Sequence, residues 1–491
     1  MTLAEAIVPN DPDLLRSDAF IAGEWVAADS GERFVVVDPA TSGTITSVPE
    51  MTGVETKRAI EAADAALPPW RALTAKQRSA HIRRFFELMV EHADDLGAIV
   101  TAEMGKPLAE SKAEVLAGAA YVEWFAEEAK RTYGEVIPQH VSNMRLLTFK
   151  QPVGVVAAIT PWNFPSGTLA RKMAPALAAG CTVVAKPAED TPLSALALAE
   201  LSVRAGIPEG AFNVVTARDP RGVGAELTAN PIVKKISFTG STPVGKLLME
   251  QSSATVKKLS LELGGNAPFI VFDDADLDAA VSEALIAKYR NGGQTCICAN
   301  RILVQDGVYD EFVERFTAAA ADLVVGPGSE SADIGPLIND AALAKVVRLV
   351  DDAVARGAQV RLGGGTDDLG RTFYQTTVLT DVEFDMPVAT EEVFGPVASI
   401  FRFSDEADAV AEANETPYGL AAYFFSRDVG RIWRVGERLH HGMVGVNTGS
   451  LMTEVAPFGG VKESGIGREG ARQGLEEFME TKYLAMGGIE G

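Results

Sequence analysis

Cysteine and histidine are scarce in this chain: its 491 residues include three cysteines and five histidines. The three cysteines (Cys181, Cys296 and Cys298) are too few for a disulfide framework, which favours a reducing, cytoplasmic setting. Two of the histidines are adjacent, and none has metal-ligand spacing with the cysteines, so we predict no metal site.

Basic charge and long apolar runs are also lacking. Lys and Arg number 44 against 67 Asp and Glu, a formal charge of −23, whereas a nucleic-acid binder needs a basic face. No apolar run approaches the roughly 20 residues that span a bilayer. Residues 1–20 have no basic region followed by an apolar core, so we do not expect a secretory signal. We therefore expect neither a nucleic-acid nor a membrane partner.

The length predicts two or three domains. Residues 54–130 carry apolar side chains at a spacing of three and four, which is typical of helices. From residue 153, short apolar runs alternate with helical stretches, and a second series of the same kind follows from about residue 276. The runs that we predict as buried parallel strands of the first series are 154–160, 181–187, 212–217, 234–240 and 267–273. Such alternation predicts doubly wound α/β sheets.

Two further segments, 131–152 and 474–491, are extended and apolar. They suit pairing at a sheet edge or extension to a neighbouring subunit. Because an exposed edge of this kind is normally covered, oligomerisation is the use that we favour.

A glycine-rich turn, residues 240–246, follows a predicted strand and begins a predicted helix, where free backbone N–H groups bind phosphate. It nearly matches the nucleotide-binding P-loop, but Leu247 replaces the hydroxyl residue that would bind Mg²⁺. A second glycine pattern, 465–470, leaves no room for a following βαβ unit and is excluded as a dinucleotide motif. The turn at 240–246 alone is equally consistent with a purely structural role.

Lys186 and Glu189 follow the second predicted strand, at the edge where open parallel sheets bind ligands. A carboxylate there can accept hydrogen bonds from ribose hydroxyls, and a lysine can donate to them. Taken alone, a solvated charge pair explains them as well.

Cys296 lies in the stretch NGGQTCIC, just after a predicted helix over 276–290. Glycines allow close backbone approach, and free N–H groups stabilise a thiolate, although cysteines are usually buried and inert. Glu262 lies in the apolar stretch LELGGNAP, where its pKa should rise towards that of a general base, unless an ion pair holds it. Asn163 lies between Pro161 and Pro165, as an amide that can stabilise an oxyanion or simply form a turn.

These segments together resemble the aldehyde dehydrogenase superfamily. The matching motifs cover nearly the whole chain: ITPWNFP, KPAEDTP, FTGSTPVG, LELGGNAP, GQTC, EEVFGP and PFGGVKESGIGREG. The resemblance implies a Rossmann-type cofactor domain (1–130 and 153–261), a second α/β catalytic domain (262–473) and a small β oligomerisation arm (131–152 and 474–491). It also implies a homodimer or homotetramer.

The resemblance implies roles for individual residues. Cys296 would be the nucleophile, Glu262 the general base and Asn163, with the Cys296 backbone N–H, the oxyanion hole. The implied cofactor is NAD, with NADP as the alternative. The implied cofactor-binding residues are Trp162, Lys186, Glu189, Gly240, Ser241, Glu392 and Phe394. A cysteine-dependent esterase would use the same Cys296 and Glu262 but leaves these residues without a role.

Within the superfamily, the chain is most similar to succinate-semialdehyde dehydrogenases. That similarity nominates Arg171 and Arg290 to bind a distal carboxylate, which guanidinium groups do well, with Thr453 and Phe458 completing the substrate site. Met452 stands where those enzymes commonly have a carboxylate-binding serine, which keeps glutarate semialdehyde or a broader aldehyde range as alternatives. Cys298 repeats a feature of some of these enzymes, a second cysteine that could form a reversible disulfide with Cys296.

Overall fold

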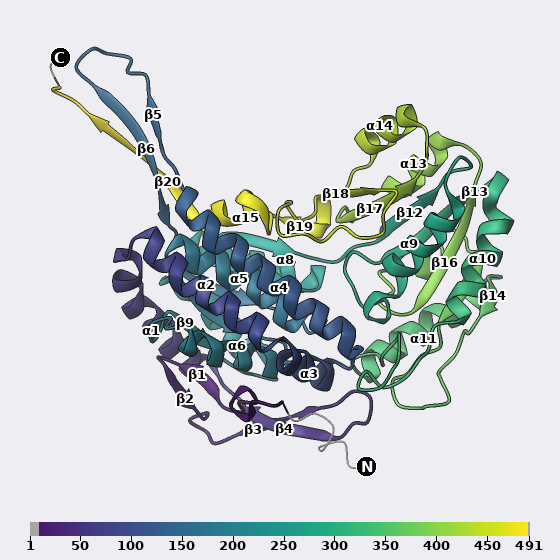
Figure 1. Ribbon diagram of the computed structural model, residues 1–491, viewed down its shortest axis with the longest axis horizontal. Coiled ribbons are helices and arrows are strands. Elements are labelled where there is room, and N and C mark those ends of the chain that lie inside the picture. The colour runs from purple at the N-terminus through teal and green to yellow at the C-terminus, as the bar shows by residue number, and fades with distance from the viewer. Residues whose placement is uncertain (1–8, 490–491) are drawn as a thin grey trace.

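Two sheets of mainly parallel strands lie beside each other, and a narrow β arm projects from the part of the molecule that contains the first sheet (Figure 1). The computed structural model describes residues 9–489, so the first eight residues of the predicted cofactor domain and the last two of the predicted arm lie outside the described part. Within residues 9–489, no helix has both the length and the apolar character needed to cross a membrane.

The first sheet has eight strands in the order β19-β11-β10-β7-β8-β9-β1-β2. Its five central strands are parallel: β7 (Val155–Ile159), β8 (Thr182–Lys186), β9 (Phe212–Val214), β10 (Val233–Thr239) and β11 (Lys258–Glu262). At its edges β1 (Ala19–Ile21), β2 (Glu24–Val26) and β19 (Gly465–Ile466) pair antiparallel. The central strands β7, β8 and β9 are almost wholly buried because helices cover both faces of the sheet.

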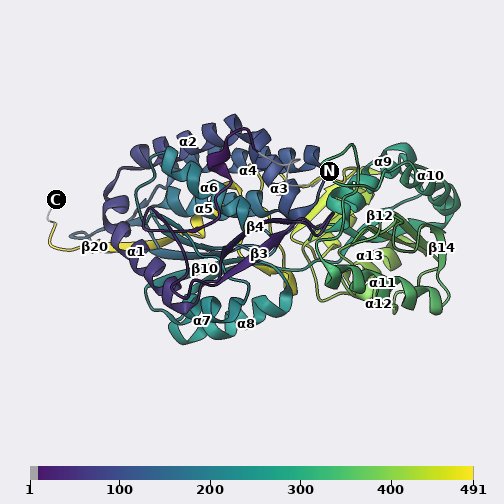
Figure 2. The same ribbon diagram turned by 90° about the horizontal axis from the view of Figure 1, so that it is seen from below.

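Helices cover the two faces unequally (Figure 2). One face carries α2 (Ala75–Glu91), α3 (Ala93–Met104), α4 (Leu108–Glu128), α5 (Pro165–Ala179) and α6 (Leu193–Arg204). The other carries α1 (Gly53–Ala72), α7 (Pro220–Ala229) and α8 (Thr242–Ser252). The predicted helical region 54–130 is therefore four helices, and the predicted doubly wound sheet is confirmed. The predicted strand 267–273 does not belong to it: β12 (Ala267–Val271) pairs in the second sheet, and β11 is the fifth parallel strand here. The predicted strand 212–217 is shorter: it is β9, whose residue pairing with β8 ends at Val214.

The second sheet has seven strands in the order β14-β15-β16-β13-β12-β17-β18. Their bounds are β12 (Ala267–Val271), β13 (Ala299–Gln305), β14 (Gln359–Leu362), β15 (Thr377–Thr380), β16 (Val397–Phe403), β17 (Ala421–Phe425) and β18 (Met443–Val446). All pair in parallel except β14, which is antiparallel to β15. The helices of this layer are α9 (Leu277–Tyr289), α10 (Tyr309–Ala321), α11 (Asp340–Ala355), α12 (Pro387–Thr390), α13 (Glu406–Asn414) and α14 (Val429–Arg438).

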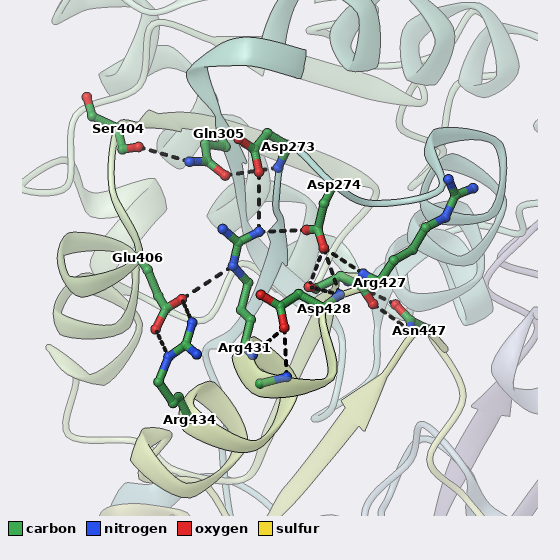
Figure 3. A network of polar contacts seen from close by, with 12 residues as sticks. Asp273, Asp274, Gln305, Ser404, Glu406, Arg427, Asp428, Arg431, Arg434 and Asn447 are labelled. Carbon is green, nitrogen blue, oxygen red and sulfur yellow. Dashed lines mark hydrogen bonds and ion pairs between the residues drawn. The ribbon is translucent and has the colours of Figure 1, made fainter.

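An ion-pair network ties α13 and α14 to the end of β12 (Figure 3). Arg431 of α14 lies 3.2 Å from Asp273, 2.6 Å from Asp274 and 3.3 Å from Glu406 of α13. Asp274 also accepts hydrogen bonds from the backbone N–H groups of Arg427 and Asp428. One partly buried guanidinium thus holds three chain segments together at the outer side of the second sheet.

The arm is a three-stranded antiparallel sheet of β5 (Glu135–Ile137), β6 (Arg145–Pro152) and β20 (Met479–Met486). β20 pairs with β6 along its whole length, so the two predicted extended segments pair with each other. Residues 474–476 belong to α15 (Ala471–Glu476), because the chain stays on the body of the protein before it enters the arm. The domain limits and the oligomeric role of the arm stay predictions.

Shorter elements complete the described chain. β3 (Arg33–Val37) and β4 (Thr44–Pro49) form a separate antiparallel pair. The 3-10 turns are Pro12–Leu14, Ala129–Arg131, Ser253–Thr255, Arg290–Gly293, Asp306–Val308 and Lys462–Ser464.

Candidate active site

Cys296 lies where two pockets meet. Its loop follows the 3-10 turn Arg290–Gly293 and leads into β13 of the second sheet. On one side Cys296 lines a small apolar pocket of about 420 Å³, and on the other a larger pocket of about 810 Å³ that reaches the first sheet. A molecule bound in either pocket can therefore contact the Cys296 thiol.

Close backbone contacts shape the Cys296 loop. Asn291, Gly292 and Gly293 are all left-handed, with φ of 53°, 60° and 76°. A Cβ on Gly293 would lie 2.2 Å from the Gly395 carbonyl oxygen, and one on Gly265 would lie 2.2 Å from that of Cys296. The glycines thus allow backbone segments to approach one another closely, and their close approach to a ligand stays a prediction.

The Cys296 thiol does not have the stabilised thiolate that the sequence suggested. The pKa of this thiol is raised to about 12, mainly by burial and also by the Glu392 carboxylate, and the Arg171 guanidinium acts in the opposite direction. Desolvation is thus the main influence on this thiol, and it disfavours the thiolate.

Glu262 is the last residue of β11, and its side chain is buried. Among residues 9–489, its Oε2 atom has no hydrogen-bond partner. Burial raises the pKa of Glu262 well above the usual range, and the neighbouring Glu469 carboxylate adds to the rise. The predicted upward shift is therefore confirmed in direction.

Asn163 lies in the turn between β7 and α5, and α5 begins at Pro165. Its side chain is 5% exposed and lines the larger pocket together with Cys296. Its Nδ2 atom donates to the Gln294 carbonyl oxygen at 3.0 Å, two residues before Cys296. The amide is thus fixed against the loop that carries the thiol.

A long groove leads from Cys296 across the first sheet. The larger Cys296 pocket shares residues of the β7 and β10 ends with a third pocket of about 1190 Å³. All seven predicted cofactor residues line one or both of these two pockets: Trp162, Lys186, Glu189, Gly240, Ser241, Glu392 and Phe394. The structure therefore gathers residues that are more than 200 positions apart.

The two ends of this groove differ chemically. Near Cys296, the rings of Trp162 and Phe394 meet edge to face at 5.4 Å. Glu392 accepts a hydrogen bond from the Gly265 N–H, although burial still raises the pKa of Glu392 to about 7. At the far end, Lys186 Nζ lies 3.2 Å from Glu189 Oε2.

Between these ends, Ser241 is the N-cap of α8 and its side chain makes no capping bond, and both Ser241 and Val244 of the first helical turn line the groove. Sequence reasoning missed Arg221 and Lys345, which also line the groove. Neither belongs to a local motif that would have revealed it.

Arg171 of α5 lines the small pocket and is 8% exposed. Its Nε atom lies 3.3 Å from Glu469, and its guanidinium packs 4.7 Å from the centre of the Phe458 ring. Its Nη1 atom has no hydrogen-bond partner within the described chain. The pocket therefore contains a buried cation with donor capacity to spare, beside the predicted substrate residue Phe458.

The other two predicted substrate residues, Arg290 and Thr453, contact residues that line this pocket. Arg290 Nη1 is 3.9 Å from the Met452 sulfur, and Met452 itself lines the pocket. The Thr453 hydroxyl donates to Glu454. Tyr121, which sequence reasoning missed, lines the pocket and donates to the Thr453 carbonyl oxygen.

Cys298 is buried and lines neither of the two Cys296 pockets. Its Sγ atom lies 3.2 Å from Lys288 Nζ and 3.3 Å from the Lys288 carbonyl oxygen. All three cysteines are free thiols. A Cys296–Cys298 disulfide would require the Cys298 side chain to leave these contacts, and it stays a prediction.

Comparison with known proteins identifies one family. The profile described as "Aldehyde dehydrogenase family" matches residues 25–484. A glutarate-semialdehyde dehydrogenase of Pseudomonas aeruginosa is 58% identical over 98% of this chain and 99% of its own. A succinate-semialdehyde dehydrogenase [NADP(+)] of Escherichia coli is 56% identical over 97% and 99%. The crystal structure of a succinate-semialdehyde dehydrogenase from Burkholderia pseudomallei is 57% identical, with a TM-score of 0.96 over 97% of this chain and 99% of that one.

The raised pKa of Cys296 predicts how the thiol reacts in the protein without cofactor. Alkylation by iodoacetamide should accelerate about tenfold per pH unit between pH 7 and 9, because only the thiolate reacts. Mass spectrometry locates the label, and Cys296→Ser supplies the control that should take up none at this site. A rate that levels off below pH 8 would show that the thiol pKa is not raised.

Proposed function

The chain belongs to the aldehyde dehydrogenase family, and on this basis we propose that it oxidises succinate semialdehyde to succinate through a thioester on Cys296. The observation that carries the proposal is the position of Cys296, between a long groove suited to a dinucleotide and a small pocket that contains Arg171. A nicotinamide dinucleotide bound in the groove would supply one chemical capability, acceptance of a hydride.

The residues around Cys296 suit the steps of this reaction. The Cys296 thiol first loses its proton to solvent, and the thiolate then adds to the aldehyde carbon. The aldehyde oxygen becomes an alkoxide that Asn163 Nδ2 and the Cys296 N–H stabilise. Loss of hydride leaves a thioester. Glu262 takes a proton from water, the resulting hydroxide attacks the thioester carbonyl, and the carboxylic acid leaves as Cys296 thiolate returns.

The groove fits a dinucleotide along its length. Lys186 and Glu189 would hold the adenosine ribose, and the N-terminus of α8 with Gly240 and Ser241 would face the pyrophosphate. Glu392 and Phe394 would hold the nicotinamide ribose and ring beside Cys296. Two observations support this fit: the N-terminus of α8 suits a pyrophosphate, and the Glu189 carboxylate, which lines the same pocket, suits the ribose hydroxyls.

We propose NAD⁺ as the preferred cofactor. The Glu189 carboxylate, next to the ribose position, would repel a 2′-phosphate. Arg221, another cation that lines this part of the groove, lies 2.6 Å from Asp219, and this ion pair reduces its availability to a phosphate. The name of the Escherichia coli relative specifies NADP(+), so this preference rests on Glu189 and not on the comparison.

The small pocket supports an aldehyde with an anionic tail. Arg171 offers the unpaired Nη1 atom, and most of the remaining lining is apolar, so a carboxylate there would meet a desolvated guanidinium. Glutarate semialdehyde is the second candidate. Met452 lines the pocket where a smaller, hydrogen-bonding residue would favour the shorter succinate semialdehyde, and the name of the Pseudomonas aeruginosa relative specifies glutarate semialdehyde.

Two further proposals concern the whole molecule. The projecting arm, with the exposed apolar side chains of Val136, Tyr483 and Leu484, supports a homodimer or homotetramer. The three free thiols support a reducing, cytoplasmic location.

Glu262→Gln should separate the two halves of the reaction. The variant keeps the side-chain shape but removes the base, so stopped-flow absorbance should show a burst near one equivalent of reduced cofactor per site, then slow turnover. Glu103→Gln is the matched control, because Glu103 is buried with a pKa of about 8 but hydrogen-bonds to the start of α6. Steady-state turnover of Glu262→Gln at the unmodified rate would remove Glu262 from the mechanism.

Succinate semialdehyde should be a much better substrate than butanal, its neutral counterpart. A hydrogen bond to a charged group contributes roughly 1.5–3 kcal/mol, or about 10- to 150-fold in kcat/KM. Arg171→Met and Arg290→Met should each remove most of this preference and affect butanal little, because the neutral tail uses neither charge. Equal kcat/KM for the two aldehydes would refute the acid-semialdehyde proposal and leave the family assignment standing.

Cofactor choice should depend on the charge of Glu189. The unmodified enzyme should have a higher kcat/KM with NAD⁺ than with NADP⁺, and Glu189→Gln should raise the value for NADP⁺ by about tenfold or more as the repulsion disappears. Asp219→Asn removes the ion-pair partner of Arg221, so the same assay tests whether the freed Arg221 raises kcat/KM with NADP⁺. Preference of the unmodified enzyme for NADP⁺ would overturn the proposal.

A further inference from the structure

A wholly buried lysine lies directly behind Asn163. Lys106 follows α3 and is 1% exposed. Its ammonium donates to the backbone carbonyl oxygen of Asn163 at 2.6 Å and to Glu114 Oε2 of α4 at 2.6 Å. It also lies 3.8 Å from the centre of the Phe164 ring. All three contacts of this cation are therefore with the Asn163 turn or with α4.

Glu114 extends the contact to the start of α5. Its Oε1 atom accepts hydrogen bonds from the Ser166 and Gly167 N–H groups, both at 3.0 Å. These are orphan donors of the first helical turn, which carboxylates satisfy well. Lys106 and Glu114 thus hold both the carbonyl of Asn163 and the helix that follows it.

The same Asn163 carbonyl oxygen is joined to the Cys296 loop. Asn291 Nδ2 donates to it at 3.1 Å and to the Gln294 carbonyl oxygen at 3.2 Å. Asn163 Nδ2 donates to that Gln294 oxygen at 3.0 Å. On α4, Glu110 accepts the Asn291 N–H at 2.8 Å, one helical turn from Glu114. The Asn163 peptide is therefore fixed from one side by Lys106 and from the other by the loop that carries the thiol.

Stability alone does not account for a charge at this place. Burial lowers the pKa of Lys106, which reflects the cost of desolvating the ammonium, and Glu114 offsets part of that cost. Apolar side chains of similar size often replace buried ion pairs without loss of stability. What an apolar side chain cannot do is donate to the Asn163 carbonyl oxygen and so hold the direction of that peptide.

We propose that Lys106 is a positioning residue that acts through Asn163: its ammonium fixes the Asn163 peptide so that the side-chain amide faces the oxygen formed at Cys296. This inference rests on the proposed oxyanion role of Asn163. A displacement of about 1 Å at such a donor can cost on the order of 10²-fold in rate, and complete removal of an oxyanion donor costs about 10²- to 10³-fold.

A double-mutant cycle tests the coupling. Lys106→Met should lower kcat/KM for the aldehyde about 10- to 100-fold, and Asn163→Ala should lower it about 10²- to 10³-fold. The double variant should be no worse than Asn163→Ala, because Lys106 has nothing left to position. Binding of NAD⁺, measured by calorimetry, should stay unchanged. Losses that multiply in the double variant would overturn the proposal.

Two further variants guard against general damage. Lys106→Met with Glu114→Gln removes both charges and leaves no unpaired ion, so it keeps the test valid if Lys106→Met alone folds poorly. Lys235→Met is the matched control: Lys235 is also fully buried and paired, but with Ser260 and Glu477. It should lower the melting temperature without lowering kcat/KM of the folded enzyme.

The outcomes distinguish this proposal from the proposed function. If Asn163→Ala retains full activity, the oxyanion role and the positioning role both fail. If Asn163→Ala loses activity while Lys106→Met and the charge-free pair do not, only the positioning role fails and the proposed function stands.

Discussion

The loop that carries Cys296 is held between two sheets by backbone contacts that leave no room for a side chain. Gly265, just after β11, lies against the Cys296 carbonyl, and Gly293 lies against the Gly395 carbonyl. The first of these contacts brings in the segment that contains Glu262, and the second brings in the segment that contains Glu392 and Phe394. The groove, the small pocket and the buried carboxylates are therefore arranged around one thiol because the backbone segments meet there.

Burial of ionisable groups follows from this close packing. The same desolvation raises the pKa values of Cys296, Glu262 and Glu392. Glu469 behaves differently: burial acts upwards, but Lys172 and Arg171 lower its pKa. Arg171 and Lys172 are neighbours on α5, and both contact Glu469. One carboxylate near Cys296 is thus stabilised in its ionised form by partners, whereas burial favours the protonated form of Glu262.

Helix α4 connects packing with chemistry. Its residues Glu110 and Glu114 face the Cys296 loop and the start of α5 respectively, and Lys106 lies between that helix and Asn163. None of these residues belongs to a motif that chemistry alone would single out. Their importance depends on the fact that a segment over 50 residues earlier in the chain packs behind the Asn163 turn.

The sequence by itself determined the α/β alternation, because the length and spacing of apolar residues, bounded by glycine and proline, are local features that distinguish strands from helices. It also singled out Cys296, Glu262, Asn163 and the groove residues, since each lies in a short motif. Tertiary structure decided what local patterns do not encode. Arg290 is six residues from Cys296 and contacts the lining residues Met452 and Phe164, whereas Arg171, 125 positions away, lines the pocket itself. Side-chain direction and desolvation arise only when distant segments pack, which is why the raised pKa of Cys296 and the contacts of Lys106 could not be predicted from the sequence.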